Sequence, residues 1–178
     1  MNENMLEEII NISNNFRLID KDTIMKIARY EISKLDENTK KNFKYFLFVK
    51  NTCFGGMTNP SKGIILIDLE NCYADVNSMK KLSILEKNLY IVSVVLHEIE
   101  HLKEENKIEE ENIEGNLIYI SDFISNYEKG RIVEDNYDNN PCEKIAFAKS
   151  WKKILYIANK YPNFRENYFD AYKYINNM

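Results

Sequence analysis

Apolar residues recur three and four positions apart in two stretches near the start of the chain, residues 3–16 and 22–35. This spacing lines one face of an α-helix. Asp20 or Asp22 is available to cap the start of the second stretch. The pattern therefore predicts two opening helices, within an N-terminal helical part that covers residues 1–40.

The pattern changes between residues 43 and 69. Residues 43–50 form a short run rich in aromatic side chains, and residues 63–69 contain three β-branched isoleucines. Turn residues, Gly55-Gly56 and Asn59-Pro60, lie between the two runs. We expect two strands here, paired with each other.

A long helix is predicted over residues 83–106, after a polar stretch. Ser83-Ile84-Leu85-Glu86 has the form of a capping box, which marks a helix start. Helical patterns return further along the chain, and no repeat or linker divides it. The sequence thus predicts one α+β domain over residues 1–178, mainly helical with a small sheet. The later predicted helices cover residues 112–128, 140–161 and 164–176.

Composition narrows the function classes. The 178 residues are 44% hydrophobic and 29% charged, with a net charge of −4, which suits a globular protein and argues against a nucleic-acid partner. The start of the chain lacks a signal-peptide pattern, and the longest apolar run, residues 90–96, is too short to cross a membrane. We expect a cytoplasmic protein without a membrane partner, whose three cysteines are reduced thiols.

The only two histidines lie four positions apart, in His97-Glu98-Ile99-Glu100-His101. This is the HExxH pattern of zinc sites, and its chance occurrence here is on the order of one in a thousand. Four residues along a helix turn a side chain by only about 40°, so both imidazoles can bind one ion. The apolar stripe of this helix is centred on the opposite side, which argues against both histidines being core residues. Glu98 is the candidate general base, because its carboxylate can reach a water on the zinc.

A catalytic zinc site usually has three protein ligands, and no third histidine exists here. Glu143 is the preferred third ligand because it opens the helix after the connecting segment. The alternative for Glu143 is a capping role alone, since Asn140-Pro141 precedes it. Glu104 would require three ligands from consecutive turns of one helix. The full set of candidates is Glu104, Asp122, Glu134, Asp135, Cys142 and Glu143, with Glu134 second in preference.

Together, the HExxH pattern and the later Glu143-Lys144-Ile145-Ala146 resemble zinc metallopeptidases of the Glu-zincin type. The chain is most similar to the small ImmA/IrrE-like peptidases of bacteria and their mobile elements, in which an E-x-x-A pattern supplies the third ligand. The resemblance covers about residues 63–155. The chain departs from the pattern of these peptidases at Glu100, because they often have a glycine just before the second histidine. The sequence also shows no helix-turn-helix pattern.

The resemblance implies a zincin-like domain with its small sheet packed on the HExxH helix. His97, His101 and Glu143 would hold Zn2+, with Glu98 as the base. A strand, here residues 64–69, would pair with an extended protein substrate, of which a regulatory protein is one candidate. An oxyanion would need a Tyr or Arg donor, for which Tyr137 is chosen over Tyr127 and Arg131.

Two other function classes compete with a zinc peptidase. One is a catalytically inactive zincin-derived module that binds zinc and another protein. The other is a helical interaction protein without metal. The pattern leaves open the substrate, the cleavage site and the oligomeric state.

Overall fold

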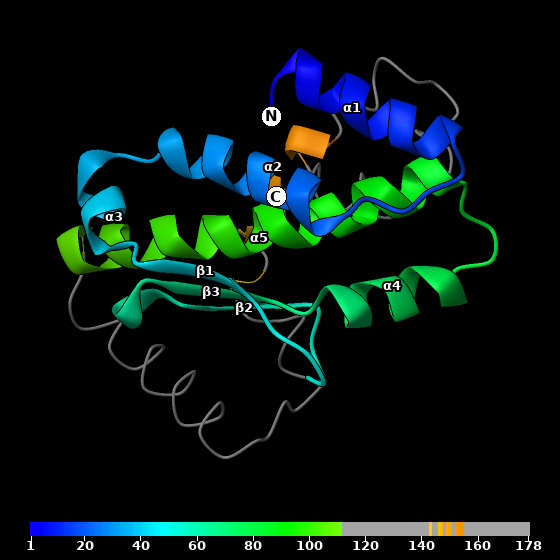
Figure 1. Ribbon diagram of the computed structural model, residues 1–178. Helices are drawn as coiled ribbons and strands as arrows, with labels where there is room; N and C mark the ends of the chain where they lie inside the picture. Colours follow the sequence, from blue (N-terminus) through cyan, green and yellow to red (C-terminus); the bar gives the residue numbers. More distant parts are fainter. Residues whose placement is uncertain (112–142, 144–145, 148, 151, 155–178) are drawn as a thin grey trace.

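The structure is a computed structural model that describes residues 1–111, 143, 146–147, 149–150 and 152–154, with the side chains of residues 104–111 left out (Figure 1). The helices predicted over residues 112–128 and 164–176 lie outside the described residues, as does part of the one predicted over 140–161.

Both opening helices are present, as α1 (Glu3–Asn14) and α2 (Lys21–Ser33). Asp20 caps α2, because its carboxylate accepts a hydrogen bond from the Thr23 amide at 2.9 Å. A third, short helix, α3 (Glu37–Asn42), was not predicted. It is mostly polar, so the apolar periodicity that identifies a helix is missing from it.

Three short strands form a mixed sheet in the order β1-β3-β2. The expected strands are β1 (Tyr45–Phe48) and β3 (Ile64–Ile67), which pair in parallel. The segment interpreted as turns contains β2 (Gly56–Asn59), which pairs antiparallel with β3 and is followed by the 3-10 turn η1 (Pro60–Lys62). The turn prediction was therefore wrong for Gly56, which pairs with Ile67.

The strand arrangement corrects one expectation. Residues 64–69 were expected to offer a free edge to a substrate, but β3 is the central strand and both of its edges are occupied. Leu69 already belongs to the next helix, α4 (Leu69–Ser78). Sequence periodicity identifies a strand but not its neighbours, so it could not show that β3 lies in the middle.

The polar stretch that follows β3 also contains a helix. α4 buries only Leu69, Cys72 and Val76, so its apolar face is narrow. Its N-cap is Asp68, whose carboxylate accepts a hydrogen bond from the Asn71 amide at 3.1 Å. Three buried apolar positions in ten residues give only a weak periodic signal, so this helix was not predicted.

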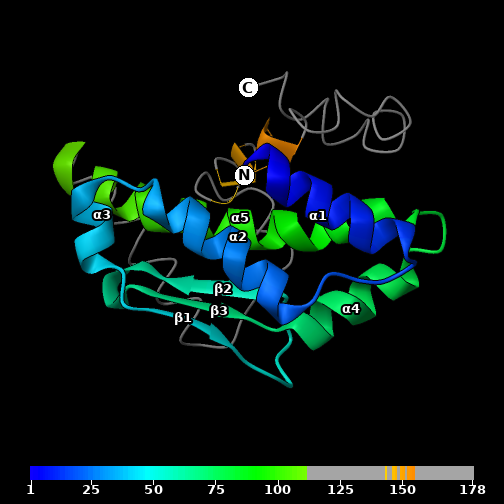
Figure 2. The same cartoon turned by 45° about the horizontal axis from the view of Figure 1, so that its top comes forward.

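The HExxH helix, α5 (Ile84–Glu111), is the centre of the fold. It begins at the predicted capping box, in which the Glu86 amide bonds to Ser83 Oγ and the Ser83 amide bonds to the Glu86 carboxylate. The helix is described as far as Glu111, five residues beyond the predicted end. In Figures 1 and 2, α1 and α2 cover one side of α5, and the sheet and α4 lie on the other side.

This central position covers α5 on nearly all sides over residues 84–103, where the side chains are described. Its buried apolar residues form one core with Ile9, Ile24, Ile27 and Ile65, and Ile154 joins the same core. The apolar stripe predicted from the sequence is therefore only part of a wider buried surface. The buried apolar residues of α5 are Leu89, Ile91, Val92, Val95, Leu96, Ile99 and Leu102.

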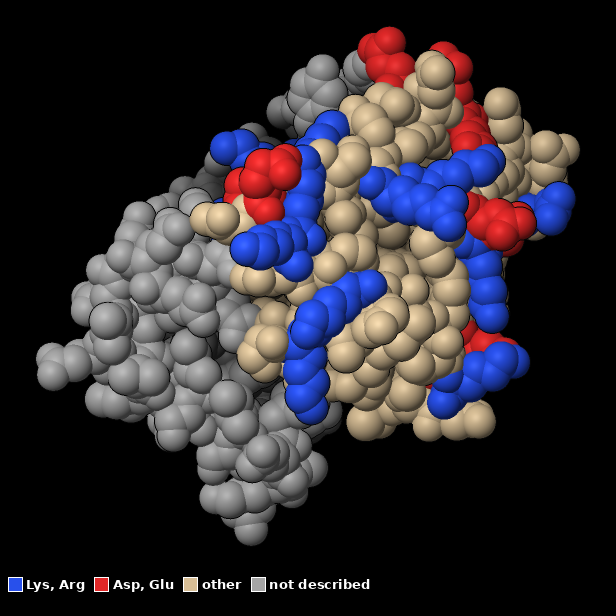
Figure 3. Space-filling view, turned by 60° about the vertical axis from the view of Figure 1, so that its left-hand side comes forward, with Lys and Arg blue, Asp and Glu red and all other residues tan. Residues whose placement is uncertain are grey.

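The surface carries charges of both signs. Figure 3 shows basic and acidic side chains side by side at several places on one face, with uncharged surface between them. Exposed pairs such as Lys40 with Glu37, 2.9 Å apart, contribute little to stability. Among the described helices, none has a stretch long and apolar enough to cross a lipid bilayer.

Asn88 joins α5 to the connection between α1 and α2. Its side chain is completely buried, accepts a hydrogen bond from the Ile19 amide at 2.8 Å, and donates to Ser13 Oγ at 2.8 Å and the Arg17 carbonyl at 2.9 Å. One side-chain amide of α5 thus bonds to three groups of α1 and of the connection that follows it.

We predict that Asn88→Ala lowers the free energy of unfolding by about 2–4 kcal/mol, because it leaves the buried Ile19 amide without this partner and removes the hydrogen bonds to Ser13 and Arg17. Chemical denaturation followed by circular dichroism measures the loss. Asn77→Ala, at an exposed position on α4, is the control and should change stability by less than about 0.5 kcal/mol. Equal effects of the two substitutions would contradict the role of Asn88.

Candidate metal centre

His97 and His101 lie one helical turn apart on α5, and their side chains converge. The two Nε2 atoms are 3.0 Å apart, and the rings meet edge to face with centroids 4.6 Å apart. The side chains are only 12% and 14% exposed. The histidines do lie away from the predicted apolar stripe, yet they are covered rather than solvated.

Glu143 brings the third polar group to this pair. Its Oε2 lies 2.9 Å from Nε2 of His97 and 3.4 Å from Nε2 of His101. Its carboxylate is buried, which by itself raises its pKa, but hydrogen bonds and charge interactions with His101 and His97 outweigh burial and bring the pKa below its usual range. Glu143 is therefore a carboxylate at neutral pH, with an oxygen directed at both histidines.

The three side chains fit a divalent cation such as zinc. Two imidazole nitrogens and one carboxylate oxygen are a ligand set of known catalytic zinc sites. Ligands about 2.1 Å from a tetrahedral zinc are about 3.4 Å from one another, and the three atoms here are separated by 2.9, 3.0 and 3.4 Å. The two shorter separations would need to lengthen by about 0.5 Å to produce that geometry.

Among the described residues, His97, His101 and Glu143 are the one group of three whose potential ligand atoms lie this close together. The preferred third ligand thus lies where the sequence interpretation expected it. The other candidates, Asp122, Glu134, Asp135 and Cys142, lie outside the described residues, as does the side chain of Glu104. So do Tyr137, the expected oxyanion donor, and its alternatives Tyr127 and Arg131.

Ala146, one helical turn after Glu143, is completely buried. A larger side chain at this position would have no room, so the small residue allows the Glu143 segment to approach closely. Both described positions of the E-x-x-A pattern, Glu143 and Ala146, are therefore buried.

Glu98 follows His97 but contacts the sheet. Its side chain is buried between α5 and β2, and Oγ1 of Thr58 lies 2.8 Å from both the Glu98 Oε2 and the Glu98 carbonyl oxygen. Burial raises the pKa of Glu98 to about 7, although the His97 charge and the Thr58 hydrogen bond act in the opposite direction. Such a carboxyl group can both take up and release a proton near neutral pH.

Gly56 leaves the space that Glu98 occupies. A Cβ atom at Gly56 would lie 2.7 Å from Cγ and 2.8 Å from Oε1 of Glu98, closer than atoms can approach. Sequence analysis missed both Gly56 and Thr58. The glycine pair was a visible signal, because a glycine inside a strand often marks a close approach of another group.

Comparisons of the chain with protein-family models, with curated proteins and with solved structures give no match. The resemblance to ImmA/IrrE-like metallopeptidases therefore stays a prediction, and the functional interpretation depends on the site itself.

We predict that the purified protein binds about one zinc per chain, and that His97→Ala and Glu143→Ala each lower this content well below stoichiometric because two ligands remain. Metal analysis after dialysis measures the content. Glu37→Ala, at a highly exposed position on α3, is the control and should retain zinc. Full zinc content in Glu143→Ala would show that another residue is the third ligand.

Proposed function

We propose that this protein is a zinc-dependent peptidase that hydrolyses peptide bonds in a protein substrate. The observation that carries the proposal is the convergence of His97, His101 and Glu143, next to a buried glutamate at the second position of the HExxH pattern. In this proposal the first three residues hold the metal and Glu98 is the general base.

Zinc in such a site supplies a Lewis acid that lowers the pKa of a water molecule to about 7 and polarises a carbonyl group. Glu98 then takes a proton from the attacking water on its carboxylate and returns it to the nitrogen of the leaving amine. Thr58 holds the base in position through the hydrogen bond to Oε2. A pKa near 7 suits both proton transfers.

The strand β2 is the proposed support for the substrate. It packs on α5, and within the described residues it pairs only with β3, so its second edge is paired with no described strand. An extended peptide can add to such an edge through main-chain hydrogen bonds, which require no particular side chains. The presence of Thr58 on β2 places this edge close to the proposed base.

We predict that Glu98→Gln lowers the rate of peptide cleavage by about 10²–10⁴-fold, because the glutamine amide cannot accept a proton from water. Zinc binding should stay intact, because Glu98 is not one of the three proposed ligands. Turnover of a denatured protein substrate and zinc content are measured on the same sample. Glu37→Gln is the matched exposed control. If the wild type cleaves nothing although it holds zinc, the inactive zinc-binding interaction module becomes the better interpretation.

Gly56→Ala tests the contact between β2 and the base. The backbone φ of Gly56 lies outside the left-handed region, so only the added methyl group conflicts with Glu98. We predict a loss of kcat of about 10–100-fold with zinc retained, because small displacements of a catalytic group have effects of this size. Gly55→Ala, whose methyl group would meet Cys72 and Val94 instead, should lower kcat less. An unchanged kcat in Gly56→Ala would contradict this role.

A further inference from the structure

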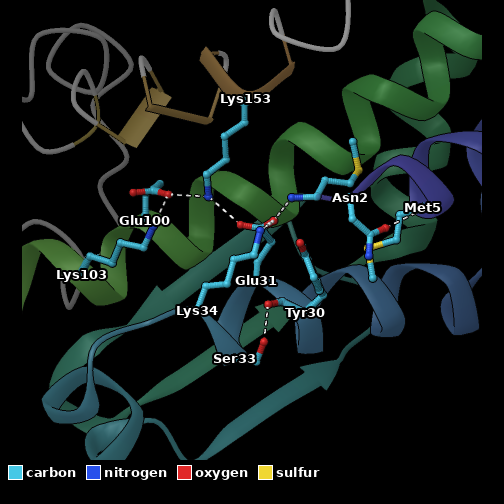
Figure 4. Close-up of polar contacts among 10 residues, drawn as sticks. Asn2, Met5, Tyr30, Glu31, Ser33, Lys34, Glu100, Lys103 and Lys153 are labelled. Carbon is cyan, nitrogen blue, oxygen red and sulfur yellow. Dashed lines mark hydrogen bonds and ion pairs between the residues drawn. The ribbon is translucent and has the colours of Figure 1, made fainter.

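A second cluster of charged groups is buried beside the candidate metal centre. Glu31 on α2 and Glu100 on α5 have side chains that are only 4% and 3% exposed. Nζ of Lys153 lies between them, 2.8 Å from Oε2 of Glu31 and 2.9 Å from Oε1 of Glu100 (Figure 4). One ammonium group thus connects two helices to the segment that carries Glu143.

Each carboxylate has further cationic neighbours. Nζ of Lys103 lies 2.6 Å from Oε1 of Glu100, and Nζ of Lys34 lies 3.9 Å from Oε1 of Glu31. The terminal ammonium group of Met1 also contacts Glu31. Lys153 is the one residue among these that contacts both carboxylates, so its removal would separate the cluster into two parts.

The pKa of Lys153 agrees with a fixed charge. Burial by itself would lower this pKa, but the hydrogen bonds to Glu31 and Glu100 outweigh burial and raise the pKa above its usual value. The side chain is therefore an ammonium at neutral pH and can make charge-assisted hydrogen bonds to both carboxylates.

Glu143 and Lys153, near the two ends of the range that holds the later described residues, contact the same part of α5. Glu143 contacts His97 and His101, while Lys153 contacts Glu100, which directly precedes His101. The buried side chains of Ala146, between Glu143 and Lys153, and of Ile154, directly after Lys153, provide apolar contacts. Apolar burial is non-directional and tolerates small rotations and shifts, whereas hydrogen bonds from one ammonium to two carboxylates fix position and direction.

We propose that Lys153 is a positioning residue that holds the Glu143 carboxylate at the metal centre by fixing its segment to Glu31 and Glu100. This inference rests on the proposed function, in that it requires the three ligands to bind zinc. It also gives a reason for the glutamate at position 100, where the resembling peptidases often have a glycine. In this chain Glu100 is the attachment point on the ligand-bearing helix for the segment that brings the third ligand.

The test compares zinc affinities, measured by competition with a chromophoric chelator, in the full-length protein. Lys153→Met keeps much of the side-chain length but removes the charge, and we expect it to weaken zinc binding about 10–100-fold, the range typical for residues that orient metal ligands. Lys153→Arg keeps the charge and should restore most of the affinity. Lys152→Met, at the exposed neighbouring position, is the matched control and should bind zinc as the wild type does.

A double-mutant cycle separates positioning from a general loss of stability. If Lys153 acts through Glu143, then Lys153→Met should cause little further loss of zinc affinity in protein that already carries Glu143→Ala. An equal loss in both backgrounds would overturn the inference. Absorption spectra of the cobalt-loaded proteins give a second readout, since Lys153→Met should move the spectrum towards that of Glu143→Ala.

The possible failures are distinguishable. A wild type that binds no zinc overturns both the proposed function and this inference. A wild type that binds zinc, together with Lys153→Met of unchanged affinity, overturns only the role of Lys153. If Lys153→Met does not fold, as judged by circular dichroism, Glu100→Gln replaces it, and the same loss of affinity and the same double-mutant result are expected.

Discussion

The structure depends on the burial of a helix that carries both the core and a series of charged or polar groups. α5 is covered on nearly all sides, yet Asn88, Glu98 and Glu100 are buried within it and the two histidines are mostly covered. A buried polar group without a partner is strongly destabilising, so each of these groups requires a partner from elsewhere in the chain. The remaining elements supply those partners.

Each partner comes from a different element. The connection between α1 and α2 supplies the groups that bond to Asn88, β2 supplies Thr58 for Glu98, and the segment 143–154 supplies Lys153 for Glu100. The candidate metal centre is therefore complete only when helices, sheet and the later segment have assembled around α5. The requirement that buried charged and polar groups be paired explains why residues far apart in the sequence meet along this helix.

Strong local signals were sufficient for much of the fold. Caps and apolar periodicity predicted α1, α2 and α5, and short β-branched or aromatic runs predicted β1 and β3. The missed elements lack such signals, because β2 contains a glycine and only one buried residue, while α4 has a narrow apolar face. The neighbours of β3 depend on pairing between distant segments, which no local pattern contains.

The sequence by itself determined the two converging histidines, the adjacent Glu98 and the helix that holds them, since four-residue spacing fixes both imidazoles on one side of any α-helix. Glu143 was selected among several carboxylates by argument, and only the tertiary structure brought its oxygen to within 2.9 Å of His97. The burial of Glu98 against Gly56 and Thr58, and the bridge from Lys153 to Glu31 and Glu100, were likewise decided only by folding. The reason is that burial and the pairing of charges depend on which distant segments pack together, and sequence spacing determines only what is local.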